Sequence, residues 1–151
     1  MTAIIFPGQG SQYLNMSMDF NENFNVARKV FQEIEDITQI NIRKIISENH
    51  LDQLNQTNYT QISIFSASMA IYKSLLNECG LDNLKPKIFL GHSLGEYSAL
   101  VAASFINIAD ASILIKKRGE LMHLSIEPNI SGMAAIIGKN ADFIHDVIKK
   151  K

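Results

Sequence analysis

Hydrophobic residues gather in short runs along the chain, and two of these runs predict β-strands. Residues 2–6 are almost entirely apolar and are closed by Pro7 and Gly8, a pattern typical of a buried strand that ends in a turn. Residues 87–90 form a similar run, which leads directly into Gly91. We therefore expect two buried strands, each followed by a glycine-containing loop.

Most other apolar residues recur at helical spacing or form longer apolar stretches. The segments predicted to be helical are residues 23–36, 60–79, 96–105, 107–125 and 141–150. Asn107 and Asp110 resemble a helix N-cap, and Gly80 is well placed to end a helix. The polar residues 48–58 predict at most short helices, and residues 132–137 are a further strand candidate. Strands that alternate with helices predict an α/β fold with a parallel sheet.

Composition and charge exclude several classes of protein. The 151 residues are 46% hydrophobic and 19% charged, which is ordinary for one globular domain. The net charge of −1 provides no basic excess for holding nucleic acid or an anionic membrane. Cys79 is the single cysteine, and no Cys/His cluster has the spacing of a metal site. We see neither a signal peptide nor a membrane-spanning stretch, and therefore expect a cytoplasmic protein.

The strongest chemical signal is G-x-S-x-G at residues 91–95, between a predicted strand and a predicted helix. This context is typical of a nucleophile elbow, in which a sharp turn exposes the serine hydroxyl above the sheet. Ser93 is then the candidate nucleophile, and the N–H of Leu94 is a candidate oxyanion donor at the start of a helix. A structural turn is the alternative interpretation.

Two further residues are candidates on local grounds. Gln9 lies in a glycine-flanked loop that can bring a backbone amide close to a ligand, although a plain turn explains that loop equally well. Arg118 is centred on an apolar stripe if residues 107–125 are helical, because these neighbours lie within about 60° of it: Ala111, Leu114, Leu121, Met122 and Ser125. An inward arginine needs a partner. That partner is either a structural carboxylate or a carboxylate brought by a substrate, unless the side chain extends to water.

The other polar candidates are weaker. His92 is adjacent to Ser93, and neighbouring side chains diverge, so we interpret it as a supporting residue rather than a base. Gln61, near the start of a predicted helix, reads by itself as an ordinary polar residue. No histidine of this sequence is a convincing catalytic base.

Three motifs in order resemble malonyl-CoA:acyl carrier protein transacylases, the acyltransferase family of fatty-acid and polyketide synthesis. They are residues 5–12 (IFPGQGSQ), residues 91–99 (GHSLGEYSA) and Arg118-Gly119. The resemblance extends from Thr2 to about Gly138. It implies transfer of a malonyl group from malonyl-CoA to the phosphopantetheine thiol of acyl carrier protein through a malonyl-serine ester, without a cofactor.

The resemblance also implies roles for individual residues. Ser93 matches the acylated serine, Gln9 and Leu94 match the oxyanion-hole positions, and Arg118 matches the arginine that pairs with the malonyl carboxylate. His92 matches the motif histidine, and Gln61 matches a glutamine close to the active site.

Full members of this family are about twice as long, and their histidine base lies in the C-terminal half. We therefore expect a partial hydrolase-like sheet over residues 1–128 and the opening βα of a ferredoxin-like subdomain over residues 129–151. The catalytic base is expected to be absent from these residues. Two other functions remain open: a serine thioesterase or hydrolase that uses the same elbow, and a non-catalytic remnant that binds CoA or carrier protein.

Overall fold

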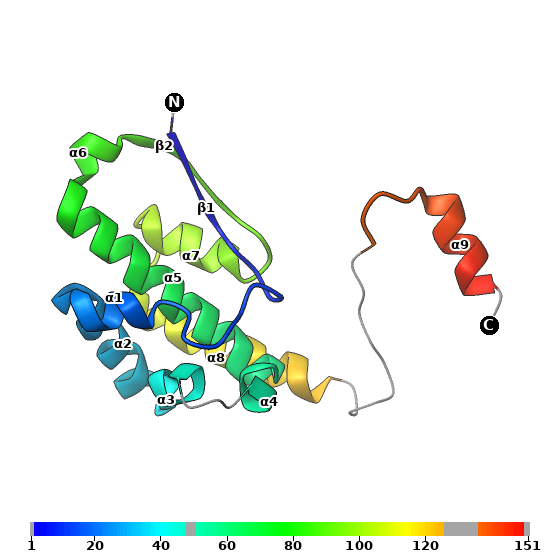
Figure 1. The fold of residues 1–151 in the computed structure, drawn as a ribbon, viewed down its shortest axis with the longest axis horizontal. Helices are drawn as coiled ribbons and strands as arrows, with labels where there is room; N and C mark the ends of the chain where they lie inside the picture. The colour runs from blue at the N-terminus through cyan, green and yellow to red at the C-terminus, as the bar shows by residue number, and fades with distance from the viewer. Residues whose placement is uncertain (1, 48–50, 126–135, 150–151) are drawn as a thin grey trace.

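The computed structural model describes residues 2–47, 51–125 and 136–149. Two strands, β1 (Thr2–Phe6) and β2 (Pro86–Gly91), pair in parallel, and helices pack beside them (Figure 1). The predicted α/β class with a parallel sheet is confirmed. None of the helices in these ranges combines the length and apolar character that crossing a bilayer requires.

The strand pair is anchored on one face by aromatic residues. Ile4 pairs with Phe89, and Phe6 pairs with Gly91, so both phenylalanines lie on the same face of the sheet. Their rings make edge-to-face contacts with Tyr72 at centroid distances of 5.8 and 6.2 Å. Burial raises the pKa of the Tyr72 hydroxyl, which donates to a helix carbonyl at 3.2 Å.

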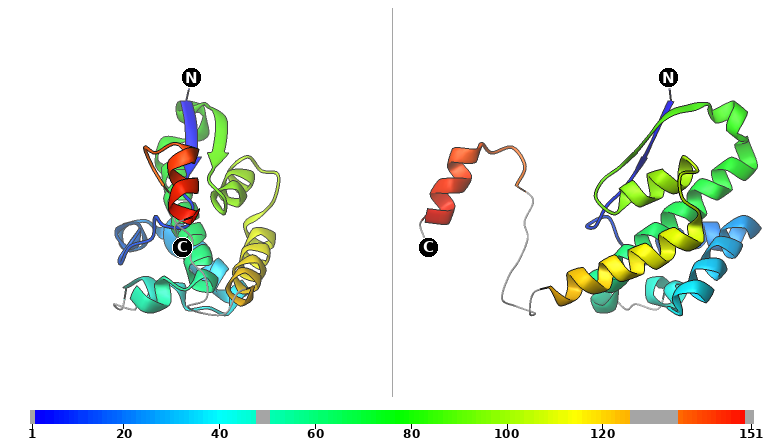
Figure 2. Two further views of the ribbon diagram at one scale, coloured as in Figure 1. Left: turned by 90° about the vertical axis from the view of Figure 1, so that its right-hand side faces the viewer. Right: turned by 180° about the vertical axis from the view of Figure 1, so that it is seen from behind.

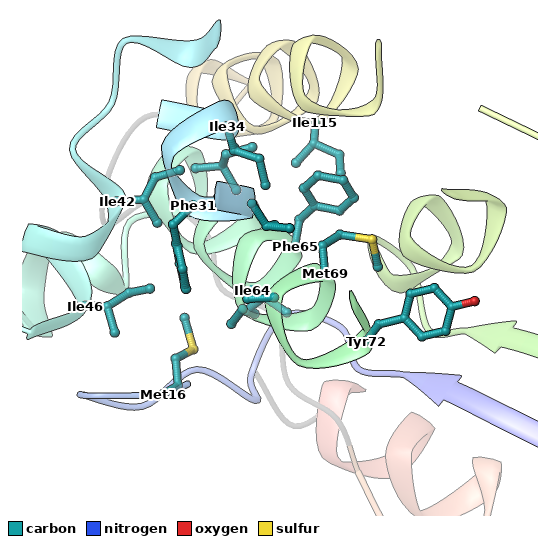
Figure 3. Packing of buried hydrophobic residues seen from close by; sticks show 14 of the residues in the cluster. Met16, Phe31, Ile34, Ile42, Ile46, Ile64, Phe65, Met69, Tyr72 and Ile115 are labelled. Carbon is teal, nitrogen blue, oxygen red and sulfur yellow. The ribbon is translucent and has the colours of Figure 1, made fainter. Parts of the chain in front are cut away.

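The core is organised around α5 (Thr57–Cys79), which helices α2 (Asn25–Thr38), α7 (Gly95–Ala102) and α8 (Ile108–Leu124) contact. Figure 3 shows side chains from several elements meeting around α5. Apolar residues of α5 such as Phe65 and Met69 are fully buried, and Phe31 and Ile34 of α2 pack into the same cluster. The predicted helices 23–36 and 60–79 are therefore confirmed, with boundaries shifted by at most three residues.

Shorter helices complete the N-terminal part: α1 (Met18–Asn23), α3 (Ile42–Ser47) and α4 (Leu51–Leu54). The structure has another four-residue helix, α6 (Leu81–Leu84), immediately before β2. The hydrophobic pattern did not predict α1, α3 or α6, because one or two helical turns contain too few residues to define a period.

The predicted cap of α8 is confirmed. The side chain of Asn107 accepts a hydrogen bond from the Asp110 N–H at 2.7 Å. Gly80 ends α5 with a positive φ of 72°, as its position predicts. The helix predicted over 96–105 ends earlier, at Ala102.

The C-terminal helix α9 (Ala141–Lys149) is also confirmed, and Figure 2 shows it standing away from the other helices. Most of the strand predicted over 132–137 lies outside the described residues, and so does the predicted boundary between 128 and 129. The ferredoxin-like subdomain therefore stays a prediction.

The second face of the strand pair is apolar and exposed. In the observed register, Ile5 lies opposite Leu90, and Ala3 lies opposite Ile88. The exposed fractions of Ile5, Leu90 and Ile88 are 70%, 49% and 41%. Parallel sheets normally have both faces covered, and within the described residues each strand also keeps one unpaired edge.

We expect the isolated 151-residue polypeptide to self-associate or to be poorly soluble, because this face and both strand edges are open to other chains. Size-exclusion chromatography with light scattering tests this directly. Ile5→Lys, which places a charge on the exposed face, should shift the population towards monomer. A wild-type monomer with one sharp and reversible unfolding transition would contradict the expectation.

Candidate active site

Ser93 lies at the sharp turn between β2 and α7. Its φ is 55°, in the left-handed region that non-glycine residues rarely adopt. The N–H of Gly95 donates to the His92 carbonyl at 3.0 Å, and the N–H of Glu96 donates to the Ser93 carbonyl at 3.1 Å. Ser93 is exposed and directly precedes the N-terminal end of α7. This is the strand–turn–helix geometry of a nucleophile elbow.

The elbow needs glycines because its backbone segments touch. A Cβ atom on Gly91 would overlap the backbone of Gly95, and a Cβ atom on Gly95 would overlap carbonyl oxygens at the end of β1. Gly8, in the loop after β1, packs just as closely against the backbone of His92. The loop that carries Gln9 is therefore held against the turn that carries Ser93.

Arg118 reaches from α8 to Ser93. Its Nη2 donates to Ser93 Oγ at 3.0 Å, and its Nη1 donates to Gln61 Oε1 on α5. Gln61 is only 1% exposed, so its amide is a fixed acceptor rather than a mobile surface group. The guanidinium is thus positioned beside the serine by an amide from the core of the protein.

The hydrogen bonds that hold Arg118 continue through Gln61 into the loop after β1. Gln61 Nε2 lies 3.5 Å from Gln9 Oε1, and Gln9 Nε2 donates to Thr57 Oγ1 at 3.3 Å. Residues from the loop, α5, α8 and the elbow therefore form one polar network that ends at Ser93.

Arg118 has no acidic partner among the residues that the structure describes. Within the described ranges no carboxylate pairs with it, and the ion pairs found there are Arg43–Glu35 and Lys117–Glu120. The alternative of a structural salt bridge is therefore wrong for the described part of the chain. A half-buried cation without a counter-ion favours an anionic ligand.

Two backbone amides near the elbow lack an acceptor among the described residues. Neither Gln9 N–H nor Leu94 N–H donates to a backbone carbonyl in the described part of the chain. Leu94 is the N-cap of α7, where N–H groups lack intrahelical acceptors and the helix dipole favours negative charge. Both amides are therefore candidate hydrogen-bond donors, with Gln9 exposed and Leu94 buried in this structure.

None of the described histidines forms a hydrogen bond with the Ser93 hydroxyl. His92 is exposed, and its backbone N–H donates to the Phe6 carbonyl at 3.1 Å, which ties the elbow to β1. His123 and His145 are exposed, and no described histidine donates to or accepts from Ser93 Oγ. His50 lies outside the described residues.

The predicted orientation of Arg118 is right, but of the predicted stripe around it only Ala111 is buried. Leu114 and Leu121, placed on the inward stripe, are 49% and 56% exposed. The buried residues of α8 are Ala111, Ser112, Ile115 and Gly119. A Cβ atom on Gly119 would lie 3.1 Å from an α5 Cα atom, so α8 meets α5 at its smallest residue. Arg118 flanks this contact, and its guanidinium donates to Gln61 of α5 and to Ser93 of the elbow.

Three contacts in the site were not predicted. Thr57 binds Gln9, Met122 Sδ lies 3.1 Å from Gln61 Nε2, and the Tyr97 ring lies beneath Arg118 with its centroid 5.9 Å from Cζ. Tyr97 belongs to α7, whereas Ser93 precedes this helix, so no helical spacing in the sequence links the two residues.

Comparison with known proteins decides the family. Residues 3–143 match the family described as the acyl transferase domain. The chain belongs to this acyltransferase family. It is 34% identical over 148 residues to the malonyl CoA-acyl carrier protein transacylases of Bacillus subtilis strain 168 and of Haemophilus influenzae. These alignments cover 98% of this chain but 45% and 47% of the relatives, so the chain spans about half their length.

Solved structures of acyltransferases share the fold. The malonyl CoA-acyl carrier protein transacylase of Clostridium perfringens matches 98% of this chain and 46% of its own, with a TM-score of 0.82 and 34% identity. The acyl-carrier-protein S-malonyltransferase of Bartonella henselae matches 99% of this chain and 48% of its own, with a TM-score of 0.86 and 36% identity. The fold described above is therefore the fold of the corresponding part of these acyltransferases.

Proposed function

We propose that this chain is the nucleophile-bearing part of an acyltransferase that moves a malonyl group from malonyl-CoA to the phosphopantetheine thiol of acyl carrier protein. The pathway we propose is fatty-acid biosynthesis, in the cytoplasm. Residues 1–128 are assigned to the hydrolase-like part of the fold, and residues 129–151 to the start of the small subdomain. The observation that carries the proposal is the 3.0 Å contact between Arg118 Nη2 and Ser93 Oγ.

This contact sets the length of the acyl group. A carboxylate that binds Arg118 takes the place of Ser93 Oγ as the acceptor for Nη2, and the freed Oγ then lies next to the bound acid. The carbon that Oγ attacks must therefore lie very close to the carboxylate. In a malonyl thioester a single methylene separates these groups, whereas a longer diacid would have to fold back on itself.

The first half-reaction uses groups that the elbow already holds. Ser93 Oγ attacks the thioester carbon, a C–O bond forms, and the oxyanion accepts hydrogen bonds from the N–H groups of Gln9 and Leu94. When the intermediate collapses, the C–S bond breaks and CoA leaves as a thiolate, which is a much better leaving group than an amine. A malonyl ester on Ser93 remains, with its carboxylate on Arg118.

In the second half-reaction the phosphopantetheine thiol attacks the ester and releases Ser93. A solved relative supports this partner: it is a malonyl-transacylase of a type II polyketide synthase in complex with its acyl carrier protein, 37% identical to this chain with a TM-score of 0.76. The match covers 83% of this chain and 40% of that one. The resemblance assigns the base that accepts the Ser93 proton to the half of the family fold that these residues do not include, so we expect turnover far below that of a full-length member.

The product of the reaction distinguishes the proposed acyltransferase from the alternative, a serine hydrolase. Incubation with labelled malonyl-CoA and holo acyl carrier protein should yield malonyl-carrier protein, because the thiol is a good nucleophile and no described histidine is placed to activate water at Ser93. Liquid chromatography with mass spectrometry distinguishes this product from free malonate. Apo carrier protein, which lacks the phosphopantetheine thiol, is the matched control. Free malonate formed at equal rates with either carrier protein would support the hydrolase instead.

The third candidate is a remnant that binds CoA or carrier protein without chemistry. It predicts measurable binding of CoA by calorimetry together with no covalent adduct after prolonged incubation with malonyl-CoA. Our proposal predicts an ester on Ser93 in the same sample.

A further inference from the structure

The aromatic ring beneath Arg118 has no role in the steps above. Tyr97 lies in the first turn of α7, whereas Ser93 lies in the turn that precedes this helix. The Cζ atom of Arg118 lies over the Tyr97 ring, 5.9 Å from its centroid. Tyr97 is half-buried, which limits the water that competes for the guanidinium.

We propose that Tyr97 is a positioning residue: its ring fixes the plane of the Arg118 guanidinium and so sets the preference for a carboxylate-bearing acyl group over a neutral one. This inference rests on the proposed function of Arg118 as the carboxylate clamp. It assigns the clamp a second support besides Gln61.

The need for a second support follows from the contacts. Without substrate, Arg118 is held by Gln61, Ser93 and the Tyr97 ring. A bound carboxylate displaces the Ser93 contact and leaves one hydrogen bond and one ring. A single hydrogen bond at Nη1 lets the planar group rotate, whereas the ring face restricts that rotation. Two parallel hydrogen bonds to a carboxylate require a fixed plane.

The proposed role belongs to the ring and not to the hydroxyl. No hydrogen bond of the Tyr97 hydroxyl occurs among those of the described residues, whereas the ring makes the contact with Arg118. Tyr97→Phe should therefore behave as wild type, while Tyr97→Leu removes the ring and keeps an apolar side chain of moderate size.

The experiment compares the wild-type chain with Tyr97→Leu, Tyr97→Phe and Tyr13→Leu. Tyr13 is 64% exposed, so its variant is the matched control for loss of a tyrosine. Initial rates of Ser93 loading are measured by intact mass with malonyl-CoA and with acetyl-CoA. We expect Tyr97→Leu to lower the malonyl-to-acetyl ratio by about three- to tenfold and the other variants to keep it. A purely structural role for Tyr97 would slow both substrates equally and leave the ratio unchanged.

A binding measurement keeps the test independent of chemistry. Calorimetric affinities for malonyl-CoA and acetyl-CoA should show the same loss of preference in Tyr97→Leu. A chain that prefers malonyl-CoA in binding but forms no ester would overturn the proposed function, while the affinity ratio still reports on Tyr97. An unchanged ratio in Tyr97→Leu, or an equal loss in Tyr97→Phe, overturns the assignment of the ring. A wild-type chain with no preference for malonyl-CoA in either measurement overturns it as well.

Discussion

Ser93→Ala is expected to abolish covalent loading from malonyl-CoA, a fall on the order of a thousandfold or more, because the acyl-accepting oxygen is removed. The fold should survive, since alanine has the same Cβ atom as serine in the left-handed conformation of this turn. Intact mass after incubation, followed by mapping of the modified peptide, measures the effect.

Ser47→Ala is the matched control for this variant. Ser47 is exposed on α3, and its hydroxyl donates only to a carbonyl one turn earlier. Loading should be unchanged in this variant. An adduct that persists in Ser93→Ala, for instance as a thioester on Cys79, would show that Ser93 is not the nucleophile.

Arg118→Ala should lower the ratio of malonyl to acetyl loading by roughly ten- to hundredfold, the range expected for loss of charged hydrogen bonds to the carboxylate. Acetyl loading should change far less, because the acetyl group has no carboxylate to lose. Parallel time courses with the two thioesters measure the ratio.

Lys117→Ala provides the comparison for Arg118→Ala. Lys117 is the neighbouring cation on α8, and its long 3.9 Å pairing with Glu120 is exposed, so its loss should leave the ratio within about twofold. Equal effects of the two alanine variants would indicate a general charge effect on CoA binding. An unchanged ratio of malonyl to acetyl loading in Arg118→Ala would show that Arg118 does not bind the malonyl carboxylate.

Patterns that span several helical turns or a complete motif predicted the fold well. The strand over residues 2–6 and the capped helix after Asn107 are where the sequence places them. The short helices α1, α3 and α6 were not predicted, because their position depends on tertiary packing rather than on a helical period of hydrophobic residues. The buried face of α8 illustrates the same limit. Gly119 allows α8 to pack closely against α5, and a pattern of large apolar residues does not reveal this contact.

The candidate site likewise has a part that local sequence predicts and a part that depends on tertiary packing. The elbow at Ser93 follows from local spacing, because Gly91 and Gly95 are required within a single turn. The brace that Gln61 provides joins residues 57 positions apart, and the Gln9 contact spans 52 positions. Only the assembled helices bring these groups together, so local sequence indicated no role for Gln61 beyond that of a polar residue near the start of a helix.

The central claim is that Ser93 accepts a malonyl group whose carboxylate lies on Arg118. Site-mapped mass spectrometry of the wild-type chain, incubated separately with malonyl-CoA and acetyl-CoA, tests it most directly. We predict one malonyl ester, located on Ser93 and formed faster than the acetyl ester. A malonyl group on any other residue, or equal loading from the two thioesters, would contradict the account.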